Sequence, residues 1–503
     1  MAEDIEPKDE FNEALLRQVH PEDWQNPTPD GPYNLVVVGA GTGGLVTAAA
    51  AAGLGAEVAL IERGLMGGDC LNVGCVPSKA LLASARRIRQ VQEADEFGVR
   101  IDGEVSVDFP AIMRRMRRIR SGIAHHDSAE RFAEELGVDV YLGDATFTAP
   151  NTVEVGAQQL DFSKACIATG ASPRVPLIPG LDDVPYLTNE TLFNLTEQPE
   201  HLAIIGAGAI GIEMAQAFAR FGSRVTVLEM ADGILGSEDT EAAEVVHEAL
   251  VDDGVATRLG VKIKRVDNES DGGIAIAVED GEAIACDALL LAAGRTPHVE
   301  DIGLNVAGVD ADPKTGIVVN DRLQTTNPNI FAVGDVATTS RFTHAADAMA
   351  RIAVRNALFM GRATFDETTV PRCIYTDPEL AQVGATAGDL DERGIAFNTF
   401  RTPFSENDRS IVEGEDAGFV AVHVRDGGDV ILGATLVGHG AGDLVPQLTH
   451  ALERNIGLSE LADVIHPYPT RSSAIRTAAD SYNRTRLTPF VERLFDGWLS
   501  LRR

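Results

Sequence analysis

The most regular pattern of apolar and polar positions is a repeated strand–helix–strand unit. From Tyr33 the chain reads YNLVVVGAGTGGLVTAAAAAGLGAEVALIER, in which an apolar run, a glycine turn, an Ala-rich stretch and a second apolar run follow one another. This pattern predicts a β-strand, an α-helix and a second strand that ends at Glu62. The same order returns from His201, as HLAIIGAGAIGIEMAQAFARFGSRVTVLEM, with the second strand ending at Glu229. Two βαβ units with parallel strands are therefore expected.

Each unit contains a glycine motif suited to a dinucleotide. The spacing GxGxxG is formed by Gly39, Gly41 and Gly44 in the first unit and by Gly206, Gly208 and Gly211 in the second. Such glycines allow a tight turn, close approach of a pyrophosphate and close helix-to-strand packing, while the helix N-terminus supplies a positive field. Glu62 and Glu229 each lie 23 positions after the first glycine of their unit, near the spacing at which a carboxylate binds an adenosine ribose. We predict two Rossmann-like dinucleotide-binding domains in one α/β chain.

The second carboxylate also predicts which coenzyme binds. Glu229 would accept hydrogen bonds from both ribose hydroxyls of NADH, and it would repel the additional phosphate of NADPH. Arg224 precedes the second strand instead of following it, so its position does not favour a phosphate. We expect NADH, with NADPH less favoured.

Two further regions follow the second unit. Between Asp301 and Gly334 the pattern predicts short strands and turns, closing with NPNIFAVGDVA. From Pro371 to Asp463, strand-like runs such as GFVAVHV and ILGATLVG alternate with helical stretches, and no glycine motif appears. The last region is interpreted as an α+β domain that forms an interface.

Composition and charge narrow the functional classes. The 503 residues are 44% hydrophobic, but near-continuous apolar runs such as Leu45–Leu54 are too short to cross a bilayer, so no membrane span is expected. Acidic residues outnumber basic ones 76 to 42, and a net charge of −34 disfavours nucleic acid as a partner. Only 6 of the basic residues are Lys, which suggests a halophilic protein in a salt-rich cytoplasm. An ordinary protein with a solvated acidic surface is the alternative.

The start of the chain carries an acidic segment. Residues 1–30 lack the basic start and apolar centre of a secretion signal, so a cytoplasmic location is expected. The segment is interpreted as a mobile or docking extension.

Two of the five cysteines lie close together in GDCLNVGCVPSK, as Cys70 and Cys75. In a regular helix, residues five apart are separated by roughly 8.7 Å at Cα, whereas a disulfide needs less than about 7 Å. A bridge between them would need Gly74 to deform the first turn, and a bridge in such a turn is easily reduced. The helix N-terminus and Lys79 would lower the pKa of the Cys75 thiol, as a redox couple requires.

A metal site and a pair of inert thiols are the alternatives to a redox couple. A structural metal needs four ligands, and the segment from Met66 to Lys79 contains no His and no further Cys, so no metal is expected. Two unreactive thiols stay open as an interpretation, because free cysteine is often part of a core.

Several motifs occur together in this chain: GGDCLNVGCVPSKALL, both glycine motifs, AGRTP from Ala293, IFAVGD from Ile330 and YTDPELAQVG from Tyr375. Together they resemble the class I FAD-dependent pyridine nucleotide-disulfide oxidoreductases, which include lipoamide dehydrogenase, glutathione reductase and mercuric reductase. The resemblance implies a homodimer whose first glycine motif holds FAD. The implied divisions are an acidic extension at 1–32, an FAD-binding domain at 33–180, an NAD(P)H-binding domain at 181–298, a central domain completing the FAD site at 299–368 and a C-terminal α+β dimerisation domain at 369–503.

The resemblance also implies roles for single residues. Cys75 would face the flavin, and Cys70 would exchange electrons with the substrate. Lys79 would lie near flavin N5 and pair with Glu213. The other implied cofactor-binding positions are Asp335 at the ribityl chain, Ala345 in a helix that begins near His344, Thr169 and Gly170 at the domain border, and Gly294 in AGRTP. Electrons would pass from NADH through FAD to a Cys70–Cys75 disulfide, and the resulting dithiol would reduce an acceptor.

One segment departs from the family pattern. Disulfide-reducing members end in HPTxxE, whose histidine and glutamate relay protons, whereas this chain has HPYPTRSSAIRTAADSY from His466. Tyr468 takes the histidine position and Ser473 the glutamate position. A phenol with a pKa of about 10 is a poor proton shuttle at neutral pH. His466 could act instead, or it could be a surface or interface histidine.

A tyrosine at the position of Tyr468 is similar to the pattern of mercuric reductases. The segment RRIRSGIAHHDSAERF at 117–132 is also similar to a segment of their relatives, although its arginines could equally form a solvated helix face. The cysteine pair that ends mercuric reductases proper, and their N-terminal CxxC domain, have no counterpart here. The favoured substrate is a small-molecule disulfide or a thiol-bound metal, as in a mercuric-reductase-like enzyme. The alternatives are dihydrolipoamide dehydrogenase, as a subunit of a 2-oxoacid dehydrogenase complex, and a flavoprotein electron relay docked to a partner.

Overall fold

The chain folds into two units of mixed α/β structure. The computed structural model describes residues 5–103, 105–269, 272–279 and 281–503. One unit comprises the described residues before Ala231 together with those of 255–367, and the other comprises 231–254 and 368–503. The first unit therefore contains both glycine motifs and the cysteine pair, and the second contains the segment with Tyr468.

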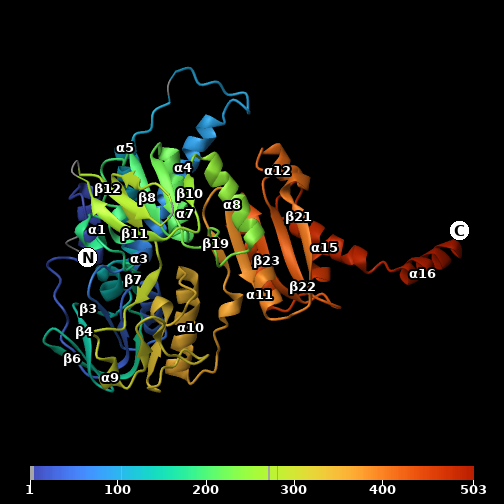
Figure 1. Ribbon diagram of the computed structural model, residues 1–503. Helices are drawn as coiled ribbons and strands as arrows, with labels where there is room; N and C mark the ends of the chain where they lie inside the picture. Colours follow the sequence, from blue (N-terminus) through green and yellow to red (C-terminus); the bar gives the residue numbers. More distant parts are fainter. Residues whose placement is uncertain (1–4, 104, 270–271, 280) are drawn as a thin grey trace. The chain divides into compact units, whose positions relative to one another are not determined.

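The first predicted βαβ unit is present at the centre of a seven-stranded sheet (Figure 1). The strands in spatial order are β3 (Asp139–Leu142), β2 (Val58–Glu62), β1 (Tyr33–Val38), β6 (Gln158–Ile167), β5 (Thr152–Val155) and β4 (Ala145–Ala149), with β18 (Ile330–Ala332) also beside β6. The central strand β1 is parallel to both β2 and β6, and α2 (Thr42–Gly53) connects β1 to β2. The glycine turn thus leaves the carboxyl end of a central parallel strand, where ligands of open α/β sheets bind.

The second βαβ unit is also present. Its parallel sheet has the order β10 (Ala256–Arg258), β9 (Arg224–Leu228), β8 (His201–Ile205) and β14 (Ala288–Leu291), and α7 (Ala209–Phe221) connects β8 to β9. An antiparallel sheet of β11 (Ile263–Asn268), β12 (Ile274–Val278) and β13 (Ile284–Cys286) accompanies it. The short strands β7 (Ala171–Pro173) and β15 (Arg295–Pro297) pair antiparallel and join the regions that carry the two glycine motifs.

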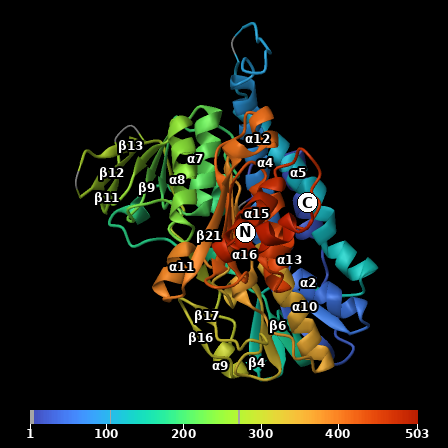
Figure 2. The same ribbon diagram turned by 90° about the vertical axis from the view of Figure 1, so that its right-hand side faces the viewer.

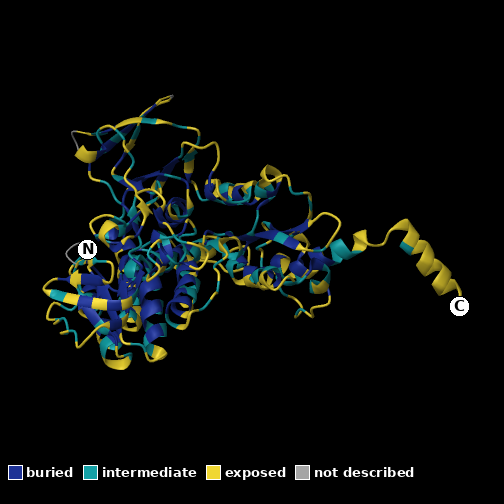
Figure 3. Ribbon diagram, turned by 90° about the horizontal axis from the view of Figure 1, so that it is seen from below, coloured by how far each residue is buried: buried dark blue, intermediate teal, exposed yellow. Residues whose placement is uncertain are grey.

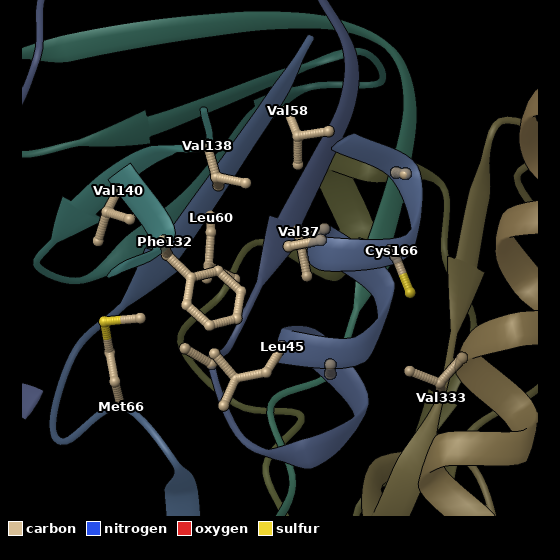
Figure 4. Packing of buried hydrophobic residues seen from close by; sticks show 14 of the residues in the cluster. Val37, Leu45, Val58, Leu60, Met66, Phe132, Val138, Val140, Cys166 and Val333 are labelled. Atoms are coloured by element: carbon tan, nitrogen blue, oxygen red, sulfur yellow. The ribbon is translucent and has the colours of Figure 1, made fainter. Parts of the chain in front are cut away.

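Small side chains allow close packing beside the first sheet. The Ala-rich helix α2 contacts α10 (Thr343–Phe359), and a Cβ added at Gly43 would lie only 3.0 Å from a methyl carbon of Val333. Figure 4 shows part of the apolar cluster on this side, with Val37, Leu60 and Cys166 from neighbouring strands. Cys166 is completely enclosed, and burial raises the pKa of its thiol to about 12, so this cysteine is an unreactive core residue.

The N-terminal segment is part of the folded first unit, which differs from the expectation of a mobile extension. Helix α1 (Glu10–Val19) contacts α5 (Phe109–Ile123), and Leu15 and Val19 are completely buried in the core. Beyond the helix, the indole of Trp24 donates to the carbonyl of Val140 on β3. The segment has apolar residues at helical spacing, and burying them against α5 stabilises a helix this short. Residues 1–4 lie outside the described part of the chain.

The second unit contains a five-stranded antiparallel sheet. Its order is β19 (Arg372–Ile374), β20 (Glu379–Gly384), β23 (Ile431–Gly438), β22 (Phe419–Arg425) and β21 (Phe397–Pro403). Helices α13 (Ala441–Glu453) and α15 (Ser473–Thr485) contact these strands, as Figure 2 shows for α15 beside β21. Helix α8 (Thr240–Asp252) contacts β20 and β23, so residues 231–254, which fall within the range expected for the nicotinamide domain, belong to this unit.

The final helix α16 (Pro489–Ser500) has no buried residue and is exposed along its length (Figure 3). The remaining helices are α3 (Gly68–Asn72), α4 (Cys75–Gln92), α6 (Asn189–Leu192), α9 (Leu304–Ala307), α11 (Ala387–Glu392), α12 (Asp408–Val412) and α14 (Leu458–Leu461), and the remaining strands are β16 (Ala311–Asp312) and β17 (Gly316–Ile317). Within the described ranges, no helix combines the length and apolar character needed to cross a membrane.

Candidate redox site

The two neighbouring cysteines lie on separate helices. Cys70 belongs to α3, which ends at Asn72, and Cys75 is the first residue of α4. Gly74 occupies the break between the helices, where an added Cβ would lie 2.7 Å from the carbonyl oxygen of Asp69 and 3.5 Å from Cα of Cys70. A side chain at this position would force the two turns apart. The helical path is therefore interrupted between the cysteines at Gly74, which is the deformation that a bridge between them would need.

The two thiols are free and share a hydrogen bond that gives them unequal acidity. The hydrogen bond from Cys70 is the main cause that lowers the pKa of Cys75 to about 6, and the Thr343 hydroxyl and the Lys79 ammonium act in the same direction. The pKa of Cys70 is raised, by its hydrogen bond to Cys75 and then by burial. Cys75 is thus the thiolate of the pair at neutral pH, and Cys70 keeps its proton.

A lysine and a buried glutamate connect two helices beside the thiolate. The ammonium of Lys79, one turn after Cys75 on α4, lies 2.8 Å from a carboxylate oxygen of Glu213 on α7. The side chain of Glu213 is only 6% exposed, whereas that of Lys79 is 36% exposed. The helices α4 and α7 also contact each other. The pairing expected from the resemblance is therefore seen in the geometry.

Two threonines contribute to the cysteine site without having been predicted. The hydroxyl oxygen of Thr343 lies 3.3 Å from the sulfur of Cys75, and both Thr343 and Thr42 form hydrogen bonds that lower the pKa of Cys70. Thr343 is the first residue of α10 and Thr42 the first of α2. A hydroxyl at the start of a helix is a sequence signal that could have identified both. Ala345, which was predicted, is buried in the first turn of α10.

An arginine links the cysteine segment to Asp335. The guanidinium of Arg295 forms an ion pair with Asp69, the residue before Cys70, and its Nε lies 3.4 Å from a carboxylate oxygen of Asp335. Burial raises the pKa of Asp335, and the charge of Arg295 opposes that effect. Sequence reasoning singled out Gly294 in AGRTP but missed Arg295, whose bridging position only the folded chain reveals.

The first glycine turn has the shape of a phosphate cradle. Gly39 has φ +100, and a Cβ there would collide with the backbone of Ala168, while a Cβ at Gly44 would collide with the carbonyl of Gly39. Gly41 lies at the N-terminus of α2, where backbone N–H groups are free to meet an anion. The carboxylate of Glu62 accepts from the backbone N–H of Ala40 at 2.6 Å, which fixes it beside the turn. These residues fit the dinucleotide part of FAD.

The second glycine turn repeats this arrangement. A carboxylate oxygen of Glu229 accepts from the backbone N–H of Ala207 at 2.8 Å, as Glu62 does from Ala40. A Cβ added at Gly208 would meet no heavy atom within 4 Å, so the space over the N-terminus of α7 is open. Gly206 has φ +110, and Gly211 packs against its carbonyl. The turn fits the pyrophosphate of a second dinucleotide.

The border positions predicted from the resemblance lie around strands β7 and β15. The hydroxyl of Thr169 donates to the carbonyl of His298 at 2.8 Å, and the carbonyl of Gly170 accepts from the N–H of the same residue at 2.9 Å. Gly294 accepts from the N–H of Arg174, and a Cβ at Gly294 would touch the Arg174 guanidinium at 3.4 Å. These contacts fasten the connection between the two nucleotide-binding regions.

The residues at the expected proton-relay positions belong to the second unit. Tyr468 is 80% exposed, and its hydroxyl donates to the carboxylate of Asp408 at 2.8 Å. The hydroxyl of Ser473 donates to the carbonyl of Thr470 at 2.8 Å and accepts from the amide of Asn407. Nδ1 of His466 lies 3.0 Å from the carbonyl oxygen of Val464, so its local partner is backbone. The side chains of Tyr468, Ser473 and His466 therefore each have a hydrogen-bond partner within the second unit.

The described residues contain no group of three or more His, Cys, Asp or Glu side chains that could hold a metal ion. The candidate site of the first unit is the cysteine pair, and the same unit contains both glycine turns. A thiolate, a neighbouring thiol and a lysine are positioned there for two-electron thiol chemistry.

Comparison with known proteins agrees with this geometry. Residues 33–350 match the family described as pyridine nucleotide-disulphide oxidoreductase, and residues 370–479 match the dimerisation domain of that family. The chain is 34% identical over 457 residues to a mercuric reductase from Streptomyces lividans, covering 90% of this chain and 96% of that protein. It is also 34% identical over 462 residues to a dihydrolipoyl dehydrogenase from Haloferax volcanii, covering 89% of this chain and 95% of that protein.

A solved structure supports the same conclusion. The Cu(II) complex of the HOCl-induced flavoprotein disulfide reductase RclA from Escherichia coli matches with a TM-score of 0.80 and 29% identity, covering 90% of this chain and 99% of that one. The fold and site are those of a flavin-dependent disulfide oxidoreductase. The chain belongs to the pyridine nucleotide-disulphide oxidoreductase family, whose members use FAD and NAD(P)H, and the resemblance seen in its motifs is confirmed.

Proposed function

We propose that Cys70 and Cys75 are the redox couple of an NADH-dependent, mercuric-reductase-like enzyme. The observation that carries the proposal is the pair itself: one thiol with its pKa lowered to about 6, hydrogen-bonded to a second thiol that keeps its proton, with Lys79 beside them. Unequal acidity assigns different tasks to the two sulfurs. Inert core thiols such as Cys166 lack these partners.

The first glycine turn and Glu62 would hold FAD, with Asp335 and the start of α10 nearer its ring end. Bound there, FAD supplies two-electron transfer between a nicotinamide and the cysteine pair. Lys79, fixed by Glu213, stabilises the negative charge of the Cys75 thiolate. When the thiol of Cys70 and the thiolate of Cys75 reduce an acceptor, the pair gives up two electrons and the single proton of Cys70 and closes to the Cys70–Cys75 disulfide. The proton of Cys70 must leave in that step, and the family resemblance gives exchange with the substrate to Cys70.

The nicotinamide coenzyme is proposed to be NADH. Glu229 is held at the second glycine turn by the N–H of Ala207, so its carboxylate stays where a 2′-phosphate of NADPH would approach. Gly206, Gly208 and Gly211 leave room for the pyrophosphate. Arg224 is paired with the ring of His201 and does not offer its charge to a phosphate.

The acceptor is proposed to be a thiol-bound metal ion or a small disulfide. Tyr468 and Ser473 replace the imidazole and carboxylate that relay protons in disulfide-reducing members, and the Tyr468 hydroxyl is committed to Asp408. Reduction of a thiol-bound metal needs less help from a general base. The mercuric reductase from Streptomyces lividans is a relative with 34% identity, which supports this acceptor class.

A panel of acceptors tests the proposal. Purified enzyme with NADH would be assayed with Hg(II) thiolates, lipoamide, glutathione disulfide, coenzyme A disulfide and bis-thiol disulfides, with Cys70→Ser as the matched control. We expect thiol-bound Hg(II) to give the highest kcat/KM and the control to lose that turnover. A preference for lipoamide would overturn the mercuric-reductase-like proposal and leave the redox couple standing. Equal activity of the control would overturn the couple.

The second candidate function is dihydrolipoamide dehydrogenase within a 2-oxoacid dehydrogenase complex. It is favoured by the dihydrolipoyl dehydrogenase of Haloferax volcanii, which is 34% identical to this chain. Failure to oxidise dihydrolipoamide at high salt would remove this candidate. A flavoprotein relay docked to a partner through the N-terminal segment is the third candidate. Leu15 and Val19 of that segment are buried in the first unit and Trp24 is hydrogen-bonded to Val140, so the segment is not a free extension, which argues against this candidate.

We also propose that the protein is a homodimer and works in a salt-rich cytoplasm. Residues 369–503 would form the interface of a homodimer, with the FAD-binding, nicotinamide and central domains at 33–180, 181–298 and 299–368. A match to the family's dimerisation domain supports the interface. A net charge of −34 supports a cytoplasm rich in salt. Gel filtration and activity measured across KCl concentrations test both.

A further inference from the structure

Arg120 on α5 connects the N-terminal segment to the helix that carries Cys70. Its side chain is completely buried. One guanidinium nitrogen donates to the carbonyl oxygen of Asn72 at 2.6 Å, and another donates to the side-chain oxygen of Asn12 at 2.7 Å. Asn72 is the last residue of α3, two positions after Cys70. A single buried cation therefore bridges α1 and the cysteine helix.

Arg120 is held rigidly from the N-terminal side. Asn12 is also completely buried, its side-chain amide donates to the carbonyl of Pro7 at 2.8 Å, and its backbone N–H donates to Asp9. Asp9 in turn pairs with Arg117 at 2.7 Å, so a second arginine of α5 is fixed to the same segment. Both arginines were open to interpretation as part of a solvated helix face, and the structure shows that this alternative is wrong for them.

The N-terminal segment also forms hydrogen bonds with the residues that precede α3. The N–H of Met66 donates to the carbonyl of Val19 at 3.1 Å, and Nδ1 of His20 lies 2.6 Å from the carbonyl oxygen of Gly64. The side-chain amide of Asn72 donates to the carbonyls of Met66 and Gly68, which closes the stretch between these anchors. The segment 64–72 is thus tied at its start by the residues after α1 and at its end by Arg120.

A buried guanidinium is maintained only where its hydrogen bonds offset its loss of water. Burial lowers the pKa of Arg120 to about 10, with the charge of Arg117 as a further cause, so the side chain remains charged at neutral pH. Loss of the Asn12 acceptor would leave the buried charge with one partner fewer, and Arg120 would then hold the last carbonyl of α3 less firmly.

We propose that Arg120, fixed by Asn12, is a positioning residue for the redox couple: it holds α3 by the Asn72 carbonyl and thereby keeps the sulfur of Cys70 within reach of Cys75. The inference rests on the proposed function, because it assumes that the pair cycles between dithiol and disulfide. Two thiols held close together have a high effective concentration toward each other, which favours the disulfide. Residues 5–20 are then a built-in part of the redox site.

The test measures the dithiol–disulfide equilibrium of Asn12→Ala. The holoenzyme would be equilibrated in glutathione buffers of graded ratio, alkylated, and analysed by mass spectrometry for the fraction of Cys70 and Cys75 modified. We expect a shift of about three- to tenfold toward the dithiol, because α3 is less constrained and the effective concentration falls. A tenfold shift corresponds to about 30 mV for this two-electron couple.

The controls separate positioning from general loosening. Arg114→Gln removes the ion pair between Arg114 and Glu10, which also joins α1 to α5 but is exposed and does not reach α3, so it should leave the equilibrium unchanged. Asn12→Asp keeps an acceptor for Arg120 and should restore the wild-type value. If Asn12→Ala does not fold, Asn12→Ser, whose shorter side chain cannot span the same gap, takes its place.

The redox equilibria of these variants decide whether Arg120 positions the cysteine pair. An unchanged equilibrium in folded Asn12→Ala or Asn12→Ser would overturn the positioning role, and so would an equal shift in Arg114→Gln. A wild-type enzyme whose two cysteines never form a disulfide in any buffer would instead overturn the proposed function. A shift in Asn12→Ala that Asn12→Asp reverses supports the proposal.

Discussion

The ammonium of Lys79 lies 2.8 Å from a carboxylate oxygen of Glu213, across a sequence separation of 134 residues. Lys79 follows Cys75 by one turn of α4, and Glu213 lies on the helix of the second glycine motif. The ion pair therefore fixes a positive charge beside the cysteine thiolate and anchors it to the second βαβ unit. Removing the charge of Lys79 should raise the pKa of Cys75, and removing the charge of Glu213 should lower it.

Lys79→Met should raise the pKa of Cys75 from about 6 toward the ordinary thiol value, because the lysine charge helps to stabilise the thiolate. Glu213→Gln should lower it, because the Glu213 charge acts against the thiolate. The rate of alkylation by iodoacetamide, measured against pH in the reduced enzyme, reports this pKa through its midpoint. Midpoints that move in the same direction in both variants would contradict this electrostatic assignment.

Cys70→Ala should also raise the pKa of Cys75, since the hydrogen bond from Cys70 is the largest cause of its depression. A group with a lowered pKa is charged above that pKa, so wild-type alkylation should fall as the pH drops through about 6, and the decline should begin at higher pH in the variant. Cys166→Ala is the matched control, because that thiol is buried elsewhere in the core and its removal should not move the midpoint.

Cys75→Ser should abolish turnover of the physiological acceptor and remove the long-wavelength absorbance that a thiolate beside the flavin produces in the reduced enzyme. The reason is that serine cannot form a thiolate or a disulfide. Absorbance spectra after reduction by NADH check this directly. Persistence of the band would show that Cys75 does not face the flavin.

Glu229→Ala should lower the ratio of kcat/KM for NADH to kcat/KM for NADPH by about tenfold or more, because the variant lacks the carboxylate that repels the 2′-phosphate of NADPH. The measurement is kcat/KM for both coenzymes with one acceptor. Glu62→Ala, at the equivalent place in the other glycine unit, serves as the comparison and should not change the ratio. A wild-type enzyme that favours NADPH would disprove the role given to Glu229.

Tyr468→His should raise disulfide reductase activity if the missing base limits that reaction, because an imidazole titrates near neutral pH and a phenol does not. The hydrogen bond to Asp408 raises the pKa of Tyr468 further, which makes the native phenol still less able to exchange its proton. Activity with lipoamide and glutathione disulfide would be compared across pH. No gain in the variant would direct attention to His466.

Leu15→Ala should destabilise the enzyme by about 2–5 kcal/mol, because a completely buried leucine of α1 would leave a cavity in the core of the first unit. Urea unfolding measures the loss. Glu13→Ala, on the exposed side of the same helix, should change the free energy of unfolding by about 0.5 kcal/mol or less. An effect of Leu15→Ala as small as that of Glu13→Ala would mean that the N-terminal segment is not part of the cooperative fold.

Local patterns in the sequence were enough to predict the two βαβ units, their glycine turns and the carboxylates Glu62 and Glu229, and to single out the cysteine pair. These features are local, since strand, turn and helix signals follow one another within thirty residues, and the third glycine of each motif, Gly44 or Gly211, lies against the carbonyl of the first glycine of its own turn. The family motifs extended this to Lys79 and Asp335. Even the break between Cys70 and Cys75 followed from helix geometry and one glycine.

The distant residues that contact these local features become visible in the folded chain. Arg120 and Asn12 read as ordinary polar positions on two amphipathic helices, and Thr343 and Arg295 lie more than two hundred residues from the cysteines. Their roles depend on how helices and strands pack, and hydrophobic periodicity specifies which face is buried without specifying its partner. For the same reason the N-terminal segment, acidic and plausible as a free extension, proved to be part of the core around the redox site.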